Sequence, residues 1–211
     1  MPFLLTFGDS NTHGTPPIIE RGEYRRFGAD VRWPQVCWRS LGEGWELAEE
    51  GLPGRTAAFD DPVMGDYMNG RQGLRIALQS HGPIDVLTIM LGTNDVKARF
   101  ASTPEMVMAG VAGLVDVAQS LDMQQRHGGY KILLICPPPV EEVGPIMGEF
   151  YGAAARSRAL PPLYEAFAKA RGIGFLDAGK VIAVSPVDGI HYEAEAHLKL
   201  GAAVAQAIKT L

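Results

Sequence analysis

Five residues whose side chains or backbone could together carry out acyl transfer lie far apart in the sequence: Ser10, Gly54, Asn94, Asp188 and His191. Serine is a weak nucleophile until a neighbouring base accepts its proton. An imidazole titrates near neutral pH and can both accept and return that proton. Asp188 precedes His191 by three residues, so a short turn lets it accept a hydrogen bond from Nδ1. We therefore expect Ser10 as the nucleophile, His191 as the base and Asp188 as the acid that orients it.

The oxyanion that develops on an attacked carbonyl needs hydrogen-bond donors held in place, and one such donor is typically worth about 10²–10³ in rate. We expect the backbone N–H groups of Ser10 and Gly54 and the amide of Asn94 to fill this role. Three neighbours of these residues are candidate substrate contacts: His13, Thr93 and Asp95. Asp95 could equally hold its loop by local hydrogen bonds. Asp9 is expected to cap the helix start that follows it.

These residues must be brought together by the secondary structure, in which apolar runs alternate with helical patterns. Strands are expected at residues 3–7, 45–50, 85–91, 131–136 and 174–177. Helices are expected at 31–41, 71–81, 103–125, 153–171 with a break at Pro161-Pro162, and 193–211. The near-continuous apolar run at 85–91 indicates a central strand. The alternating pattern at 45–50 indicates a strand near the edge of the sheet.

Alternation of strands with helices of more than ten residues predicts right-handed βαβ units and a parallel sheet covered on both faces. The fold class is therefore α/β, a three-layer α/β/α sandwich with a five-stranded parallel sheet. In such a sheet the carboxyl ends of all strands face one edge, where ligands and chemistry are found. The five residues named above each follow an expected strand, so we expect them to meet at that edge.

Four blocks of the sequence resemble those of the SGNH (GDSL-type) hydrolase superfamily. They are Gly8-Asp9-Ser10, Gly54, Gly92-Thr93-Asn94-Asp95 and Asp188-Gly189-Ile190-His191, in the family's order. Longer matches, among them Asp30-Val31-Arg32-Trp33 and Glu49-Glu50-Gly51-Leu52, are similar to its arylesterase/acyltransferase branch. The resemblance implies a flavodoxin-like fold, hydrolysis of short-chain and aryl esters, and in some relatives acyl transfer to alcohols or peroxide. It also implies a homo-oligomer, with octamers among the relatives, and neither a metal nor an organic cofactor.

The sequence departs from this branch in segments expected to line the substrate mouth. His13 stands where some relatives carry an aromatic residue, and the loop 140–152 has a composition of its own. The acyl and alcohol preferences of the branch are therefore not carried over. The loop 15–30 is rich in Pro, Gly and charge, which fits either a functional loop or a solvated one. Apolar residues in or next to loops, such as Tyr67 in the loop 60–70 and Tyr151 in the loop 140–152, fit either an acyl pocket or an oligomer interface.

Length and composition limit the remaining classes. With 211 residues, 46% of them hydrophobic and 20% charged, the chain fits one globular domain over residues 1–211. A net charge of −5 argues against binding to nucleic acid or to an anionic membrane. No apolar run approaches the roughly 18 residues of a membrane span. Cys37 and Cys136 lack a CxxC spacing and are expected to be free buried thiols, which indicates a cytoplasmic protein without a cysteine metal site.

Two other functions remain open. A carbohydrate O-deacetylase would share the same serine chemistry. A flavodoxin-like nucleotide or flavin binder would use the loop after the first strand as a phosphate cradle. That loop has five residues between Gly8 and Gly14 and no Lys-Ser/Thr pair, so it is neither a P-loop nor GxGxxG. Ser10 also lacks the GxSxG elbow of the α/β-hydrolases.

Overall fold

A single parallel sheet organises the protein, for which a computed structural model describes residues 1–211. Its five strands lie in the order β2-β1-β3-β4-β5, and every neighbouring pair is parallel. The strands are β1 (Phe3–Gly8), β2 (Glu46–Gly51), β3 (Val86–Met90), β4 (Lys131–Cys136) and β5 (Gly174–Asp177). This confirms the expected α/β fold class, with β3 at the centre of the sheet and β2 at one edge.

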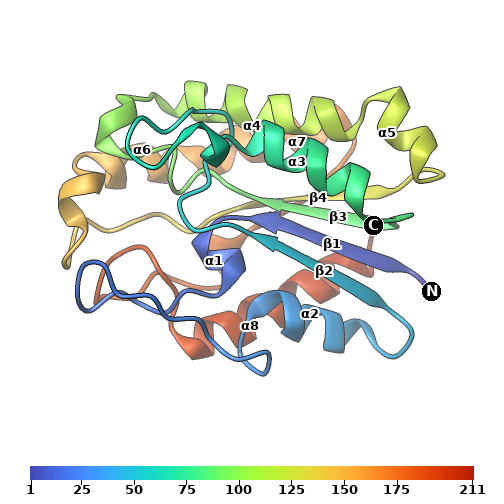
Figure 1. Cartoon of the computed structure of the whole chain (residues 1–211), viewed down its shortest axis with the longest axis horizontal. Coiled ribbons are helices and arrows are strands. Elements are labelled where there is room, and N and C mark those ends of the chain that lie inside the picture. Colours follow the sequence, from blue (N-terminus) through green and yellow to red (C-terminus); the bar gives the residue numbers. More distant parts are fainter.

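Helices cover both faces of the sheet (Figure 1). One face carries α3 (Gly70–Ser80), α4 (Pro104–Ala118), α5 (Leu121–Arg126), α6 (Ala153–Arg158) and α7 (Leu160–Arg171). The other face carries α2 (Trp33–Leu41) and α8 (Ala194–Ile208). Alternate residues of the strands supply the two cores. In β4, for example, Leu134 packs with the first layer and Leu133 with the second, and both are buried. Burial on both faces explains why the inner strands read as continuous apolar runs.

The helix expected at 103–125 is two helices, so this expectation was wrong. Residues Gln119 and Ser120 interrupt it, and Ser120 has an extended backbone with φ −59° and ψ 144°. The carbonyl of Ala118 accepts hydrogen bonds from Gln124 Nε2 and from the Tyr130 hydroxyl instead. The Ala118 carbonyl, which loses its partner within the helix at the break, is thus hydrogen-bonded by side chains. The interruption therefore leaves no unpaired buried acceptor at this carbonyl.

The break in the helical stretch 153–171 is confirmed, but it lies at Ala159 rather than at the prolines. Pro161 and Pro162 sit in the first turn of α7, where a missing N–H costs little. A short helix, α1 (Ser10–His13), follows β1 at the point where a helix start was expected after Asp9.

The loops that follow the five strands project from one edge of the sheet, at the left of Figure 1. They include the long segments 14–32, 52–65 and 137–146. Both chain termini lie toward the opposite edge. None of the helices has the length and apolar character needed to cross a membrane.

Candidate active site

Ser10 is the first residue of α1, immediately beyond the end of β1. Asp9 caps this helix, since its Oδ1 accepts a hydrogen bond from the Asn11 N–H at 2.9 Å. Gly8 lets α1 and the end of β3 approach β1 closely, because a Cβ at this position would overlap Thr12 Oγ1 and lie 2.8 Å from the carbonyl oxygen of Met90. The strand and the helix thus hold Ser10 at a defined point of the carboxyl edge.

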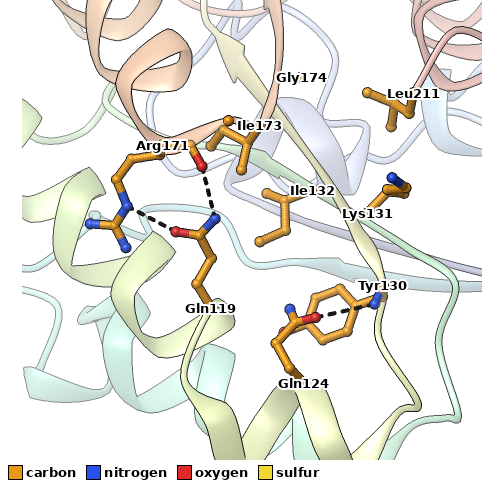
Figure 2. A pocket seen from close by; sticks show the side chains of 10 residues that line it. Gln119, Gln124, Tyr130, Lys131, Ile132, Arg171, Ile173, Gly174 and Leu211 are labelled. Atoms are coloured by element: carbon orange, nitrogen blue, oxygen red, sulfur yellow. Dashed lines mark hydrogen bonds between the residues drawn. The ribbon is translucent and has the colours of Figure 1, made fainter.

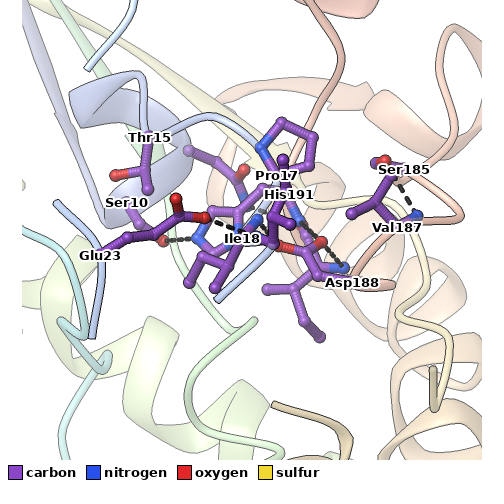
Figure 3. Close-up of polar contacts among 12 residues, drawn as sticks. Ser10, Thr15, Pro17, Ile18, Glu23, Ser185, Val187, Asp188 and His191 are labelled. Atoms are coloured by element: carbon purple, nitrogen blue, oxygen red, sulfur yellow. Dashed lines mark hydrogen bonds and ion pairs between the residues drawn. The ribbon is translucent and has the colours of Figure 1, made fainter. Parts of the chain in front are cut away.

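A chain of hydrogen bonds joins Ser10, His191 and Asp188 (Figure 3). His191 Nε2 lies 3.1 Å from Ser10 Oγ, and His191 Nδ1 lies 2.6 Å from Asp188 Oδ2. The other carboxylate oxygen, Oδ1, accepts from the backbone N–H groups of Ile190 and His191 at 3.0 and 2.9 Å. The turn 188–191 therefore presents the carboxylate to its own histidine, and all three side chains are buried.

The electrostatics of the site favour an ionised Asp188. Burial opposes its ionisation, but the hydrogen bond and charge of His191 and the N–H groups of Ile18 and His191 hold its pKa below the usual value. Asp9 differs, because complete burial raises its pKa to about 6. Of the two carboxyl groups near His191, Asp188 thus has a lowered pKa and Asp9 a raised one. Asp188 can stabilise an imidazolium at Nδ1, which is what a base that accepts the serine proton requires.

The three groups expected to form an oxyanion hole differ in whether their hydrogens have acceptors within the protein. The N–H groups of Ser10 and Gly54 have no acceptor within the protein. Gly54 has a left-handed backbone with φ +92°, a conformation that glycine adopts readily. Asn94 Nδ2 donates to the carbonyl of Arg55 at 3.1 Å and to Asp9 Oδ2 at 3.3 Å, so both of its hydrogens have acceptors within the protein. These bonds fix the Asn94 side chain between the loop after β2 and the start of α1.

Arg55 also belongs to this arrangement, although an arginine in a loop carries no local signal of a buried position. Its side chain is buried, with the guanidinium carbon 4.1 Å from the centre of the Phe7 ring. Its Nη1 donates to the carbonyls of Gly8 and Glu50. Burial lowers its pKa to about 10. Arg55 therefore ties the ends of β1 and β2 to the loop that carries Gly54.

The three candidate substrate contacts occupy different settings. Asp95 is fully buried, and both of its carboxylate oxygens accept the Ala57 N–H at 2.8 and 3.0 Å. This position favours the alternative role of holding the loop, and it does not support a substrate contact. The ring of His13 bonds within the loop 15–30, to the hydroxyls of Thr15 at 3.1 Å and Tyr24 at 3.4 Å. Thr93 is buried beside Asn94.

A cluster of ion pairs links loops at the carboxyl edge of the sheet. Glu149, from the 3₁₀ helix Met147–Phe150, lies 3.0 Å from Arg21 Nη2 of the loop 15–30. It also lies 3.5 Å from Lys97 Nζ and 3.4 Å from Arg99 Nη1, in the segment after β3. Glu149 therefore joins loops from three different parts of the chain around the carboxyl edge.

A separate depression of about 660 Å³ lies at the opposite, amino edge of the sheet (Figure 2). Its polar side chains bond to one another or to the backbone: Gln119 Oε1 accepts from Arg171 Nε at 2.8 Å, and Gln124 Oε1 accepts from the Tyr130 N–H at 3.3 Å. These bonds join the end of α4 to the end of α7, and α5 to the residue before β4. The depression shares no residue with the serine site.

The comparisons with known proteins agree with this site. The model of the GDSL-like lipase/acylhydrolase family matches residues 6–203. No match is found among the curated proteins. Among solved structures, the chain is similar to Est24, a carbohydrate acetylesterase from Sinorhizobium meliloti, with 36% identity, a TM-score of 0.93, and coverage of 100% of this chain and 99% of that one. It is equally similar to an aryl esterase from M. smegmatis, with 36% identity, a TM-score of 0.93 and complete coverage of both chains.

Another solved structure, a carbohydrate acetylesterase family member from Sinorhizobium meliloti, has 32% identity and a TM-score of 0.88, with 100% of this chain and 98% of that one covered. The expected resemblance to the SGNH hydrolases is thereby confirmed over nearly the whole chain. The protein belongs to the GDSL-like lipase/acylhydrolase family.

Proposed function

We propose that this protein is a serine carboxylic ester hydrolase in which Ser10 is the nucleophile, His191 the general base and Asp188 the acid that orients His191. The observation that carries the proposal is the continuous hydrogen-bond chain from Ser10 Oγ through His191 to Asp188. Membership of an acylhydrolase family supports the same chemistry. The alternative of a nucleotide or flavin binder gains no support from the relatives described above.

The reaction would pass through an acyl-enzyme. As Ser10 Oγ attacks the ester carbonyl carbon, its proton moves to His191 Nε2. The N–H groups of Ser10 and Gly54 would bind the resulting oxyanion. The Asn94 amide would join them by exchanging its 3.3 Å hydrogen bond to Asp9 for one to the oxyanion. The intermediate collapses, and His191 returns the proton to the departing alkoxide. In the second half, water gives a proton to His191 as it attacks the acyl carbonyl. The second intermediate then expels Ser10 Oγ, which takes that proton back from His191, and the carboxylic acid is released.

We propose short-chain and aryl esters as the substrate class. The similar M. smegmatis protein is described as an aryl esterase, and Est24 as a carbohydrate acetylesterase. The first description names an aryl ester and the second an acetyl ester. Acyl transfer to an alcohol would use the same acyl-enzyme, with the alcohol replacing water. The ratio of transfer product to acid, measured as the alcohol concentration rises, would test this extension.

A carbohydrate O-deacetylase is the second candidate, because two of the similar solved structures are described as carbohydrate acetylesterases. The two candidates differ in the alcohol portion of the ester. Activity on acetylated sugars well above that on phenyl acetate would favour the deacetylase. The opposite order would favour an arylesterase.

We also propose that the chain is a single cytoplasmic domain that forms a homo-oligomer. The two free thiols are buried, Cys37 in one core and Cys136 in the other, which fits a reducing compartment. Nine of the fifteen exposed large apolar side chains lie in loops at the carboxyl edge, and this concentration supports contact between copies. The nine are Ile19, Tyr24, Val63, Met64, Tyr67, Val143, Met147, Tyr151 and Val187.

Covalent labelling tests the central assignment. Incubation with an organophosphonate, followed by mass mapping, is expected to place the adduct on Ser10. Ser10→Ala should reduce the turnover of phenyl acetate by at least about 10⁴-fold, the scale seen when a triad member is removed. Ser40→Ala is a matched control, since Ser40 lies in α2 and its hydroxyl bonds only to the Val36 carbonyl. An adduct on another residue, or full turnover by Ser10→Ala, would contradict the proposal.

A further inference from the structure

The loop 15–30 reaches Asp188 through one backbone hydrogen bond. The Ile18 N–H donates to Asp188 Oδ2 at 2.7 Å, across 170 positions of sequence (Figure 3). This is the same oxygen that faces His191 Nδ1 at 2.6 Å. With the Ile190 and His191 N–H groups on Oδ1, the fully buried carboxylate has four N–H donors. Three of them belong to its own turn, and only Ile18 comes from elsewhere.

We propose that the Ile18 N–H is a positioning group for Asp188, so that the loop 15–30 belongs to the catalytic apparatus as well as to the substrate mouth. The inference rests on the proposed function, because it assigns Ile18 a part in the same triad. Ile18 acts through Asp188 and needs no contact with substrate.

Side chains within the loop aim this N–H. Glu23 Oε1 accepts hydrogen bonds from the Ile19 and Glu20 N–H groups. Arg25 Nη2 donates to the Pro17 carbonyl at 2.7 Å and to Glu23 Oε1 at 3.0 Å. The segment 17–20 is therefore held from both sides of Ile18. Pro16 and Pro17 add fixed φ angles immediately before it.

The hydrogen bond has a definite consequence for the reaction. The donors on Oδ1 fix that oxygen, and a second donor on Oδ2 fixes the plane of the carboxylate toward Nδ1. During attack by Ser10, His191 becomes an imidazolium that Asp188 must stabilise without taking its proton. An N–H donor to Oδ2 favours the ionised carboxylate and so opposes that transfer. The benefit is greatest in the transition state, so its loss lowers kcat rather than raising KM.

Paired substitutions at one position separate the N–H from the side chain. Ile18→Pro removes the N–H, and Ile18→Ala keeps it while shortening the side chain. With phenyl acetate, Ile18→Pro is expected to lower kcat by about ten- to a hundredfold, the size of one hydrogen bond to a charged group. We expect KM of Ile18→Pro to stay within about threefold of wild type, because Ile18 acts through Asp188. We expect kcat of Ile18→Ala to lie well above that of Ile18→Pro, because alanine keeps the N–H.

Glu23→Ala is the second route to the same test, because Glu23 holds the segment without contacting Asp188. Like Ile18→Pro, Glu23→Ala should lower kcat. The NMR resonance of the His191 Nδ1 proton gives a readout that does not depend on turnover. We expect it to shift in Ile18→Pro and Glu23→Ala, and to stay in place in Ile18→Ala.

Each result then supports or overturns the inference. An unshifted resonance with kcat near wild type in both Ile18→Pro and Glu23→Ala would overturn it. So would an Ile18→Ala variant as slow as Ile18→Pro, which would assign the effect to the side chain. If wild type and Ser10→Ala hydrolysed phenyl acetate equally, the proposed function would fail instead. The proton resonance would still report whether Ile18 positions Asp188.

Discussion

The Nε2 atom of His191 lies 3.1 Å from the Oγ atom of Ser10, although 181 positions separate the two residues. This proximity requires that the start of the chain and the turn before α8 meet at one edge of the sheet. Packing of α8 on α2 holds that turn in place. A Cβ at Gly201 of α8 would lie 2.6 Å from Val36 Cβ, so glycine permits the close approach of the two helices.

Asn94→Ala should lower the rate of ester hydrolysis with little change in KM. The amide would be lost as an oxyanion donor, and one such donor is worth about 10²–10³ in kcat. Steady-state kinetics with phenyl acetate measure the effect. Labelling of Ser10 by an organophosphonate should also slow, because the amide assists the same attack. A kcat within a few-fold of wild type would remove Asn94 from the oxyanion hole.

Gly54→Ala should destabilise the fold and disturb the same donors. The left-handed backbone at φ +92° disfavours a side chain by about 1–2 kcal/mol. The new Cβ would also lie 2.5 Å from Met64 Cε and 2.7 Å from its Sδ. Gly128→Ala is a matched control, because Gly128 has φ +74° but open space around its Cβ position.

Denaturant unfolding of these variants separates the cost of the left-handed backbone from the cost of the contact with Met64. Gly54→Ala should lose more stability than Gly128→Ala, and adding Met64→Ala should recover the difference. Equal losses in the two single variants would show that Met64 moves aside freely.

Asp95→Asn should change how stability depends on pH. Burial, reinforced by the nearby charge of Asp9, raises the pKa of Asp95 to about 7, against 3.8 for the free side chain. Between these values the folded state retains a proton that the unfolded state releases. The contribution of Asp95 therefore falls by about 1.4 kcal/mol per pH unit as pH rises from roughly 4 to 7. Asparagine cannot ionise.

The measurement is the difference in unfolding free energy between Asp95→Asn and wild type across this range. The unfolding free energy of wild type should fall relative to that of Asp95→Asn as pH rises from roughly 4 to 7. Outside this range the difference should stay constant. Asp122→Asn, at an exposed position in α5, controls for the loss of a carboxylate. A difference that is constant with pH would contradict the assigned ionisation of Asp95.

Charge placed on the exposed apolar loops should prevent self-association. Tyr67 and Tyr151 are 59% and 79% exposed, and both stand in loops at the carboxyl edge. Replacing both with Asp should convert the proposed homo-oligomer to monomer, because charges are costly at the dry centre of an interface. Sedimentation velocity gives the mass of the species. Leu121→Asp, at a 72% exposed position in α5, is the control and should leave the mass unchanged.

The main features of the fold follow from local patterns in the sequence. Every β3 position is buried and all but Thr88 are apolar, because β3 is covered on both faces. Residues 45–50 alternate because β2 lies at the edge. Ser10 and Asn94 follow strands directly, so the parallel topology alone brings them to one edge. The spacing of Asp188 and His191 is local as well, and one turn satisfies their bond.

Other features depended on contacts between segments that no local pattern relates. The division of α4 from α5 depends on the side chains of Gln124 and Tyr130, which both donate hydrogen bonds to the Ala118 carbonyl. Arg55 looks like a surface cation in sequence, yet the Gly8 and Glu50 carbonyls and the Phe7 ring give it a buried site. The contact of Ile18 with Asp188 uses a backbone N–H, which every residue except proline possesses. The sequence by itself therefore determined which residues could do the chemistry. Only the tertiary structure decided which backbone groups hold them, because those bonds depend on the path of the chain and not on residue type.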